Sequence, residues 1–332
     1  MATKNQASSS NGNCESDCKE IHDSWGRLSH LVRALASRNQ PERREIRKTY
    51  MAMYGEDLIN RFKEAQMSSQ SSDRSGFSSK IFAAMSMWML DPIERDAVVA
   101  RDALEQSDIN YKALVEILAC RKSSHVLLIK QAYHTRFKRQ LDQDIISIEP
   151  PHPFQRILVA MAASHSAHHA EVSHCIAKYD ARRLYQTGEG RAGAIDEAVV
   201  LELLSKRSIP QLKLTFLSYK HIYGHDYSQS LKNGNYGEFE DALKAVVKCI
   251  YNSPKYLAKT LYASIKGITA DNGGLARVMV SRAEVDMDEI QGVFKKKYGM
   301  ELKDSICESI SSGDYTDFLV ALATRAGTTV SS

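Results

Sequence analysis

Histidines gather in one short segment, SHSAHHAEVSHC, which occupies residues 164–175. If this segment is helical, His165 and His169 lie one turn apart on the same face, and that spacing suits zinc or copper. Histidine also titrates at about pH 6, so the cluster could make binding depend on pH. No third ligand is evident, and the alternative is a solvated histidine-rich face. The candidates for metal binding or pH sensing are His165, His168, His169 and His174.

The sequence holds no arrangement typical of a catalytic centre. It lacks the G-x-x-x-x-G-K-[ST] loop of nucleotide-binding enzymes, and no Ser/His/Asp or Cys/His pattern stands out as a nucleophile beside a base. We therefore expect a protein that is not an enzyme. The six cysteines lie far apart, which favours buried or redox-responsive thiols over a disulfide framework. Cys14 and Cys18 fall in a polar segment, where exposure is expected.

One spacing occurs four times: an arginine, an aromatic residue twelve positions later and a second aromatic residue four positions beyond it. Leucine, valine or methionine precedes each arginine by seven and by three positions, which is the helical spacing of one apolar face. Together the two spacings predict a unit of helix, short turn and helix. The four sets are Arg38/Tyr50/Tyr54, Arg121/Tyr133/Phe137, Arg207/Tyr219/Tyr223 and Arg282/Phe294/Tyr298.

Each set is followed by another apolar segment with three- and four-residue spacing, so one unit holds four or five helices over roughly 75 to 86 residues. Hydrophobic residues make up 43% of the 332 residues, enough for a packed core. We therefore predict an all-α protein built from four helical repeats. No apolar run approaches the roughly 18 residues of a membrane-spanning helix. The formal net charge of +4 permits anionic partners without indicating nucleic acid.

Six segments within these repeats are distinctive: YGEDL (54–58), MWMLDPIERDA (87–97), KQAYHTRF (130–137), LSKRS (204–208), VSRAEVDMDEI (280–290) and KKKYG (295–299). Together with the repeat spacing they make the chain resemble the annexins. Trp88, Cys120 and Cys249 make it similar to the plant branch of that family in particular. The resemblance covers residues from about 20 to 326, beyond a polar tail that we expect to be disordered. The expected division is the tail at 1–19, then repeats at 20–97, 98–178, 179–263 and 264–326.

The resemblance implies a slightly curved disc of four five-helix repeats, whose convex face binds calcium and anionic phospholipid. In each repeat a Gly-x-Gly-Thr turn supplies backbone carbonyl oxygens, and a more distant acidic side chain completes the site. Calcium takes six to eight oxygen ligands at about 2.3 to 2.6 Å, so this donor set is chemically sensible. The resemblance also implies a cytoplasmic protein that lies peripherally on the plasma membrane or endomembranes, and a role in stress responses.

The loop of the fourth repeat departs from that turn. It reads KGITA at residues 266–270, with threonine in place of the second glycine. A β-branched residue resists the positive φ angles that glycine allows. The expected acidic position is Ser309, and Glu308 is its neighbour. The weak calcium site predicted here comprises Ile265, Gly267, Thr269 and Glu308.

The loop of the first repeat reads DSWGR at residues 23–27 and is one residue short, with Glu64 as the nearest acidic candidate. Gly26 and Glu64 are therefore the calcium candidates of this repeat. Arg27 is unfavourable beside a calcium ion but favourable beside a lipid phosphate. The corresponding loops of the second and third repeats, QSDI and RAGAI, are not expected to hold calcium.

These departures predict an annexin-like protein that attaches peripherally to anionic membranes with weakened calcium dependence. Trp25 would act as an interfacial anchor, and Arg27 and Lys266 as phosphate contacts. In the alternative, Trp25 packs between helices and Arg27 is merely solvated. A second hypothesis, from another functional class, is an interaction scaffold on an annexin body that has lost calcium-dependent membrane binding.

Cys120 and Cys249 both lie in segments that we expect to be helical, and cysteines at these places lie close together in plant relatives. The pair could sense redox state; otherwise both are small buried apolar residues. Enzymatic activities proposed for relatives are poorly matched here, because Ser37 occupies the position of the histidine invoked for peroxidase activity.

Overall fold

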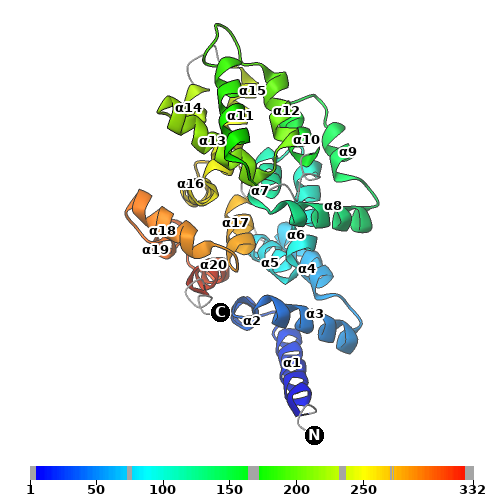
Figure 1. The fold of residues 1–332 in the computed structure, drawn as a ribbon. Helices are drawn as coiled ribbons and strands as arrows, with labels where there is room; N and C mark the ends of the chain where they lie inside the picture. The colour runs from blue at the N-terminus through cyan, green and yellow to red at the C-terminus, as the bar shows by residue number, and fades with distance from the viewer. Residues whose placement is uncertain are drawn as a thin grey trace. The chain divides into compact units, whose positions relative to one another are not determined.

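The computed structural model describes residues 5–72, 77–163, 172–231, 237–269, 271 and 273–325 (Figure 1). These residues form twenty helices, and no strand occurs among them. The predicted all-α fold is therefore confirmed. The chain divides into two compact units, one formed by Met1–Pro92 with Leu257–Ser332 and the other by Ile93–Tyr256.

The first unit combines the two ends of the chain. Helix α2 packs against α20, and α5 packs against both α17 and α20, so the first and fourth repeats share one core. The helices of the first repeat are α1 (Asn5–Asp23), α2 (Leu28–Ala36), α3 (Gln40–Tyr54), α4 (Leu58–Ser72) and α5 (Phe77–Met89). Those of the fourth are α16 (Ser253–Ile265), α17 (Gly274–Arg282), α18 (Met287–Tyr298), α19 (Leu302–Ser309) and α20 (Asp314–Arg325).

The second unit holds the middle of the chain. Helix α10 packs against α12 and α15, and α15 packs against α7, so the second and third repeats also share a core. The helices of the second repeat are α6 (Pro92–Glu105), α7 (Tyr111–Cys120), α8 (Ser123–Phe137), α9 (Leu141–Ile146) and α10 (Pro153–Ala163). Those of the third are α11 (His174–Gln186), α12 (Glu197–Lys206), α13 (Ile209–Tyr223), α14 (Tyr227–Ser230) and α15 (Glu238–Tyr251).

The recurring aromatic pair lies in the third helix of every repeat, which confirms the four-fold repetition. In each pair the first ring is fully buried and the second lies one turn later on the same face. The ring centroids are 4.7 Å apart for Tyr50–Tyr54, 5.0 Å for Tyr133–Phe137, 4.8 Å for Tyr219–Tyr223 and 4.9 Å for Phe294–Tyr298.

The recurring arginine neutralises a carboxylate; it lies in the turn just before this helix in the first three repeats and is the last residue of α17 in the fourth. In the first three repeats the partner is an aspartate on the first helix of the same repeat, whereas Arg282 in the fourth pairs with Asp286. A buried carboxylate without such a partner would be strongly destabilising. The pairs are Arg38–Asp17 at 2.9 Å, Arg121–Asp96 at 2.5 Å and Arg207–Asp180 at 2.7 Å.

A residue with left-handed backbone conformation ends the third helix of every repeat. It is glycine in three repeats, Gly55, Gly224 and Gly299, with φ of 71°, 79° and 74°. In the second repeat it is Lys138, with φ of 56°. Glycine adopts this conformation without steric cost, so the lysine introduces strain that the other three repeats avoid.

The N-terminal segment differs from the disordered tail expected at residues 1–19. Helix α1 begins at Asn5 and packs against α3. Cys14 and Cys18, expected to be exposed, are 8% and 0% exposed, and the Cys18 thiol donates to the carbonyl oxygen of Ile46 at 3.5 Å. The polar composition of this segment hides an apolar face, because Cys14, Cys18 and Ile21 recur at four- and three-residue spacing.

The expected repeat boundaries also differ from the structure. The boundaries after residues 19, 97, 178 and 263 each fall inside the first helix of a repeat. Each of these helices is the first helix of the repeat that begins there. In the examples that follow, one of its side chains stacks on the second aromatic residue in the third helix of the same repeat. Two examples are His22 on Tyr54 and Tyr262 on Tyr298, each with ring centroids 3.9 Å apart.

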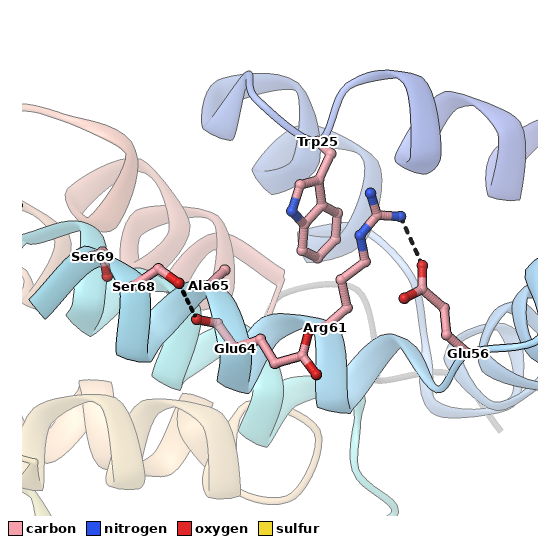
Figure 2. Close-up of a pocket in the computed structure, with 7 residues that line it drawn as sticks. All are labelled: Trp25, Glu56, Arg61, Glu64, Ala65, Ser68 and Ser69. Atoms are coloured by element: carbon pink, nitrogen blue, oxygen red, sulfur yellow. Dashed lines mark hydrogen bonds and ion pairs between the residues drawn. The ribbon is translucent and has the colours of Figure 1, made fainter.

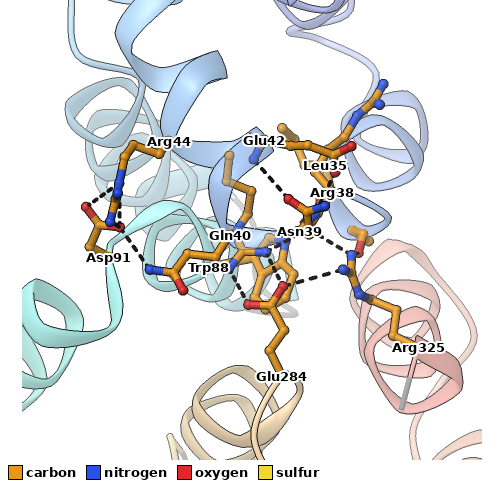
Figure 3. Close-up of polar contacts among 12 residues, drawn as sticks. Leu35, Arg38, Asn39, Gln40, Glu42, Arg44, Trp88, Asp91, Glu284 and Arg325 are labelled. Carbon is orange, nitrogen blue, oxygen red and sulfur yellow. Dashed lines mark hydrogen bonds and ion pairs between the residues drawn. The ribbon is translucent and has the colours of Figure 1, made fainter. Parts of the chain in front are cut away.

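A charged cluster ties the first repeat to the fourth within the first unit (Figure 3). Arg43 is 1% exposed and donates to both carboxylate oxygens of Glu284, at 2.9 and 2.7 Å. Its guanidinium carbon lies 3.5 Å from the centroid of Trp88, whose indole nitrogen donates to the carbonyl oxygen of Leu35 at 3.0 Å. Arg325 donates to the carbonyl oxygens at the end of α2, so four segments meet at this point.

Candidate functional site

A pocket of about 540 Å³ opens beside the loop that joins α1 to α2 in the first repeat (Figure 2). Trp25 of that loop forms one wall, and the side chains of α4 form the floor. Arg61, Glu64, Ala65 and Ser68 come together there because three- and four-residue spacing places them on one face of the helix. The lining residues are Trp25, Glu56, Arg61, Glu64, Ala65, Ser68 and Ser69.

Arg61 dominates the charge of this pocket. Its Nη1 donates to His22 Nδ1 at 2.9 Å and to the Tyr50 hydroxyl, and it pairs with Glu56 at 3.1 Å. The guanidinium carbon lies 4.1 Å from the centroid of the Trp25 ring. A fixed protein cation therefore occupies the wall of the loop that was expected to receive calcium.

Trp25 is half-buried and packed on both sides. Its ring stacks on Phe62 with the centroids 5.1 Å apart, while Arg61 lies against it. This geometry supports the alternative in which Trp25 packs between helices, since an interfacial anchor needs a ring that can leave the protein surface. Arg27 is exposed at the end of the same loop, as expected for a phosphate contact or a solvated side chain.

Gly26 and Glu64, the calcium candidates of this repeat, do not form a closed set of oxygen ligands. Glu64 lines the pocket, and its carboxylate makes no hydrogen bond or ion pair with the residues that the structure describes. Calcium needs six to eight oxygen donors, and the charge of Arg61 in the same pocket repels a divalent cation. The residues present in the first repeat do not fit a calcium ion.

The loop of the fourth repeat places a second protein cation at the expected site. Lys266 Nζ donates to Ser309 Oγ at 2.8 Å, which links the loop to the position where the family carries an acidic residue. Gly267 has φ of 65°, so the loop turns at the glycine as expected, and Thr269 accepts a hydrogen bond from the amide of Asp271 at 3.2 Å. Ala270 lies outside the described residues.

Glu308, the expected acidic ligand of the fourth repeat, is exposed on α19. Among the described residues it has no ion-pair partner, but the ammonium of Lys266 is already bound to its neighbour Ser309. A calcium ion held by Ile265, Gly267, Thr269 and Glu308 would have to displace that ammonium. The fourth repeat, as it stands, does not fit the ion either.

Ile268 is the feature of this loop that the sequence analysis missed. Its side chain is 71% exposed at the turn between Gly267 and Thr269. Asp271, further along the chain, pairs with Arg277 at 2.6 Å, and both side chains are buried. Gly274 permits this arrangement, since a Cβ there would lie 2.9 Å from the Asp271 carboxylate. The one signal in the sequence was an isoleucine inside a predicted loop.

In the third repeat, the Gly-rich loop TGEGRAGA (residues 187–194) makes a contact that the sequence did not predict. Glu189 accepts hydrogen bonds from the Tyr219 hydroxyl at 2.8 Å and from His225 Nε2 at 2.8 Å. His225 Nδ1 lies 2.9 Å from the carbonyl oxygen of Tyr223. Both ring nitrogens thus face acceptors, and the hydrogen bond to Glu189 raises the pKa of His225 above its usual value.

The other expected sites are only partly described. His165, His168 and His169 lie outside the described residues, and His174 is exposed at the start of α11. Within the described part of the chain, no group of three or more His, Cys, Asp or Glu side chains is placed to hold a metal ion. In the third repeat, the resemblance expects the acidic ligand at Gly234, which is also outside the described residues.

The two cysteines proposed as a redox pair lie in contact within the second unit. The Sγ atoms of Cys120 and Cys249 are 3.0 Å apart, and the structure has both cysteines in the reduced form. Burial raises the pKa of the Cys249 thiol well above its usual value. The pair is close enough for a disulfide after a small shift, although a protonated thiol reacts slowly.

Four segments of the chain, residues 19–70, 95–160, 179–246 and 256–322, match the family model described as Annexin. The chain is an annexin. Annexin A3 of Homo sapiens is 38% identical over 285 residues, covering 86% of this annexin and 84% of annexin A3. Annexin A4 of Mus musculus is 37% identical over 292 residues, covering 88% and 87% of the two chains.

Solved annexin structures share the fold of this annexin. A structure titled annexin III superposes with a TM-score of 0.80 at 34% identity and covers 93% of each chain. Chicken annexin V superposes with a TM-score of 0.76 at 30% identity, covering 93% of this annexin and 95% of that chain. Annexins generally bind phospholipid in a calcium-dependent way. None of the described helices combines the length and apolar character that a membrane span needs.

Proposed function

We propose that this annexin attaches peripherally to anionic membranes with a weakened dependence on calcium. The observation that carries the proposal is the hydrogen bond between Lys266 Nζ and Ser309 Oγ. The ammonium of Lys266 is bound to the residue at which the resemblance expects the acidic calcium ligand. Such a cation can attract a lipid phosphate directly, without a metal bridge.

The fourth-repeat loop offers both contributions that a peripheral membrane protein needs. Ile268 presents an exposed apolar side chain, and Lys266 beside it presents a positive charge. Each basic residue near an anionic surface contributes about 1 kcal/mol, so Arg27 and Lys266 must act together with other bases. Insertion of Ile268 adds about 2 kcal/mol if the side chain is fully buried in the lipid. Trp25 contributes by holding the first-repeat loop in place.

Co-sedimentation with phosphatidylserine vesicles tests this proposal, first in chelator and then in a rising calcium series. We expect binding in chelator at low salt that is lost at high salt, because exposed charges are screened beyond a Debye length of about 10 Å at 0.1 M. Lys266→Ala should weaken this binding, whereas Lys296→Ala, the same change of charge on α18, should not. Binding that requires micromolar calcium in the wild type would overturn the proposal.

A second variant tests the role of the Lys266 ammonium, which is bound to Ser309. Lys266→Ala combined with Ser309→Glu removes the protein cation and restores an acidic oxygen at the expected position. We expect calcium-dependent vesicle binding to appear in this double variant. Absence of binding in the wild type under both conditions would instead favour an interaction scaffold.

A further inference from the structure

Two thiols lie one helical turn apart on the buried face of α1. Cys14 and Cys18 are four positions apart in this helix, so their side chains project from the same side of it. Both thiols meet α3. The Cys14 thiol donates to the Thr49 hydroxyl at 3.5 Å. The Cys18 thiol donates to the carbonyl oxygen of Ile46, one turn earlier on α3, also at 3.5 Å.

The surroundings of this pair favour a cation over an oxidant. Burial raises the pKa of the Cys18 thiol to about 12, and the adjacent Cys14 is the next cause of the rise. The carboxylates of Asp17 and Glu15 raise it further, because their charges repel a thiolate. A protonated thiol is a poor nucleophile, so oxidation and disulfide exchange are slow. The same negative charges attract a positive ion.

The donor atoms select the kind of ion. Thiolate sulfur is a soft ligand that favours copper(I) and zinc over hard ions such as calcium and magnesium. Zinc takes four ligands in a structural site. Among the described residues, no third His, Cys, Asp or Glu side chain is placed with this pair to hold a metal ion. Copper(I) is the soft ion that two thiolates alone can satisfy.

The fold can accept the loss of both thiol protons. Ile46 lies inside α3, so its carbonyl oxygen keeps the intrahelical hydrogen bond when Cys18 no longer donates to it. The Thr49 hydroxyl can rotate and donate to the Cys14 sulfur instead of accepting from it. Cys14 is 8% exposed whereas Cys18 is fully buried, so an ion enters at Cys14.

We propose that Cys14 and Cys18 bind one copper(I) ion between their two thiolates. The ion replaces the two thiol protons, which pass to solvent, and the resulting two-coordinate complex carries one negative charge. No electron is transferred. The bound ion cross-links one turn of α1 and so stabilises that helix. None of the residues assigned to membrane contact takes part, and the site is therefore independent of the proposed membrane attachment.

The other thiol pair of the chain provides a matched control. The sulfur atoms of Cys120 and Cys249 are 3.0 Å apart and belong to α7 and α15, which pack together in one core. An ion placed between these sulfurs would have to push the two helices apart. The pair on α1 needs only a change of side-chain rotamer, because both residues belong to one helix.

Titration of the reduced full-length protein with copper(I), in competition with a chromophoric copper(I) chelator and without oxygen, tests the proposal. We expect Cys18→Ser to lose one tightly bound equivalent of copper(I), and Cys249→Ser to retain it. Serine keeps the size of the side chain and can still donate to Ile46, so the fold is preserved. The apparent Kd of the wild type should fall about a hundredfold per pH unit while both thiols are protonated, because two protons are released. Copper(I) binding that Cys18→Ser leaves unchanged, or that Cys249→Ser abolishes, would overturn the proposal.

Two measurements on the copper-loaded protein identify the site directly. X-ray absorption should show two sulfur neighbours, and a third sulfur or a nitrogen neighbour would contradict a two-thiolate site. Hydrogen exchange in residues 14–22 should slow when copper(I) is added to the wild type, because the ion holds one turn of α1 together. Exchange that stays unchanged in the wild type, or that slows equally in Cys18→Ser, would rule out binding at this pair.

Discussion

Oxidation of the Cys120–Cys249 pair should stabilise the second unit, and the size of the effect follows from the position of the two residues. They are 129 residues apart in the sequence, and their Sγ atoms are 3.0 Å apart in the fold. Closing a loop of about 130 residues lowers the entropy of the unfolded chain by about 17 cal/mol/K, or about 5 kcal/mol at 25 °C. Strain in the native state reduces this gain, so we expect about 2 to 5 kcal/mol.

The assay compares urea unfolding of the reduced and oxidised protein, with mass spectrometry to confirm the loss of two hydrogen atoms. Cys249→Ser is the control, since it removes the disulfide but keeps the size of the side chain. Oxidation should accelerate as the pH rises, because burial raises the pKa of the Cys249 thiol and only the thiolate reacts. An oxidised protein no more stable than the reduced one, or a pair that never forms the bond, would refute the reasoning.

Three further predictions concern single side chains. Lys138→Gly should raise the free energy of unfolding by about 1 kcal/mol in urea melts, because the residue has positive φ where the other repeats use glycine. Glu284→Gln should lower it by about 3 kcal/mol, since it leaves the buried Arg43 without its charge partner, and a thermal melt that does not change would contradict this. The pKa of His225 is raised by Glu189, so the ion pair is complete below about pH 6.5 and is lost as pH rises through the folded-state pKa. Hydrogen exchange in residues 187–195 should therefore increase with pH beyond the intrinsic rate, and His225→Gln should abolish that excess.

The spacing of residues along the sequence was enough to predict the repeat architecture. The recurring arginine and aromatic pair predicted helix, turn and helix in all four repeats, and the third helices α3, α8, α13 and α18 carry the pairs as expected. This works because helical periodicity is a property of neighbouring residues in the chain. It failed at α1, where two small thiols and a single isoleucine are the buried apolar side chains described, so composition alone suggested disorder.

The sequence also showed that the first and fourth loops depart from the Gly-x-Gly-Thr turn, but not which side chains lie beside them. Arg61 bonds to His22, 39 residues away, and Lys266 to Ser309, 43 residues away. No periodicity connects such residues, because their distance depends on how separate helices pack. The choice between Trp25 as an anchor and Trp25 as a packed side chain was likewise open until the tertiary structure placed Arg61 and Phe62 against it.

The sequence of this annexin therefore determined its helices, its repeats and the departures from the Gly-x-Gly-Thr turn, since each is a matter of residue type at a given spacing. Only the tertiary structure decided where the charges of Arg61 and Lys266 lie, because contacts across loops depend on the packing of side chains from helices far apart in the chain. Two other contacts also required the tertiary structure. Glu189 and His225 are 36 residues apart in the sequence, and Cys120 and Cys249 are 129 residues apart.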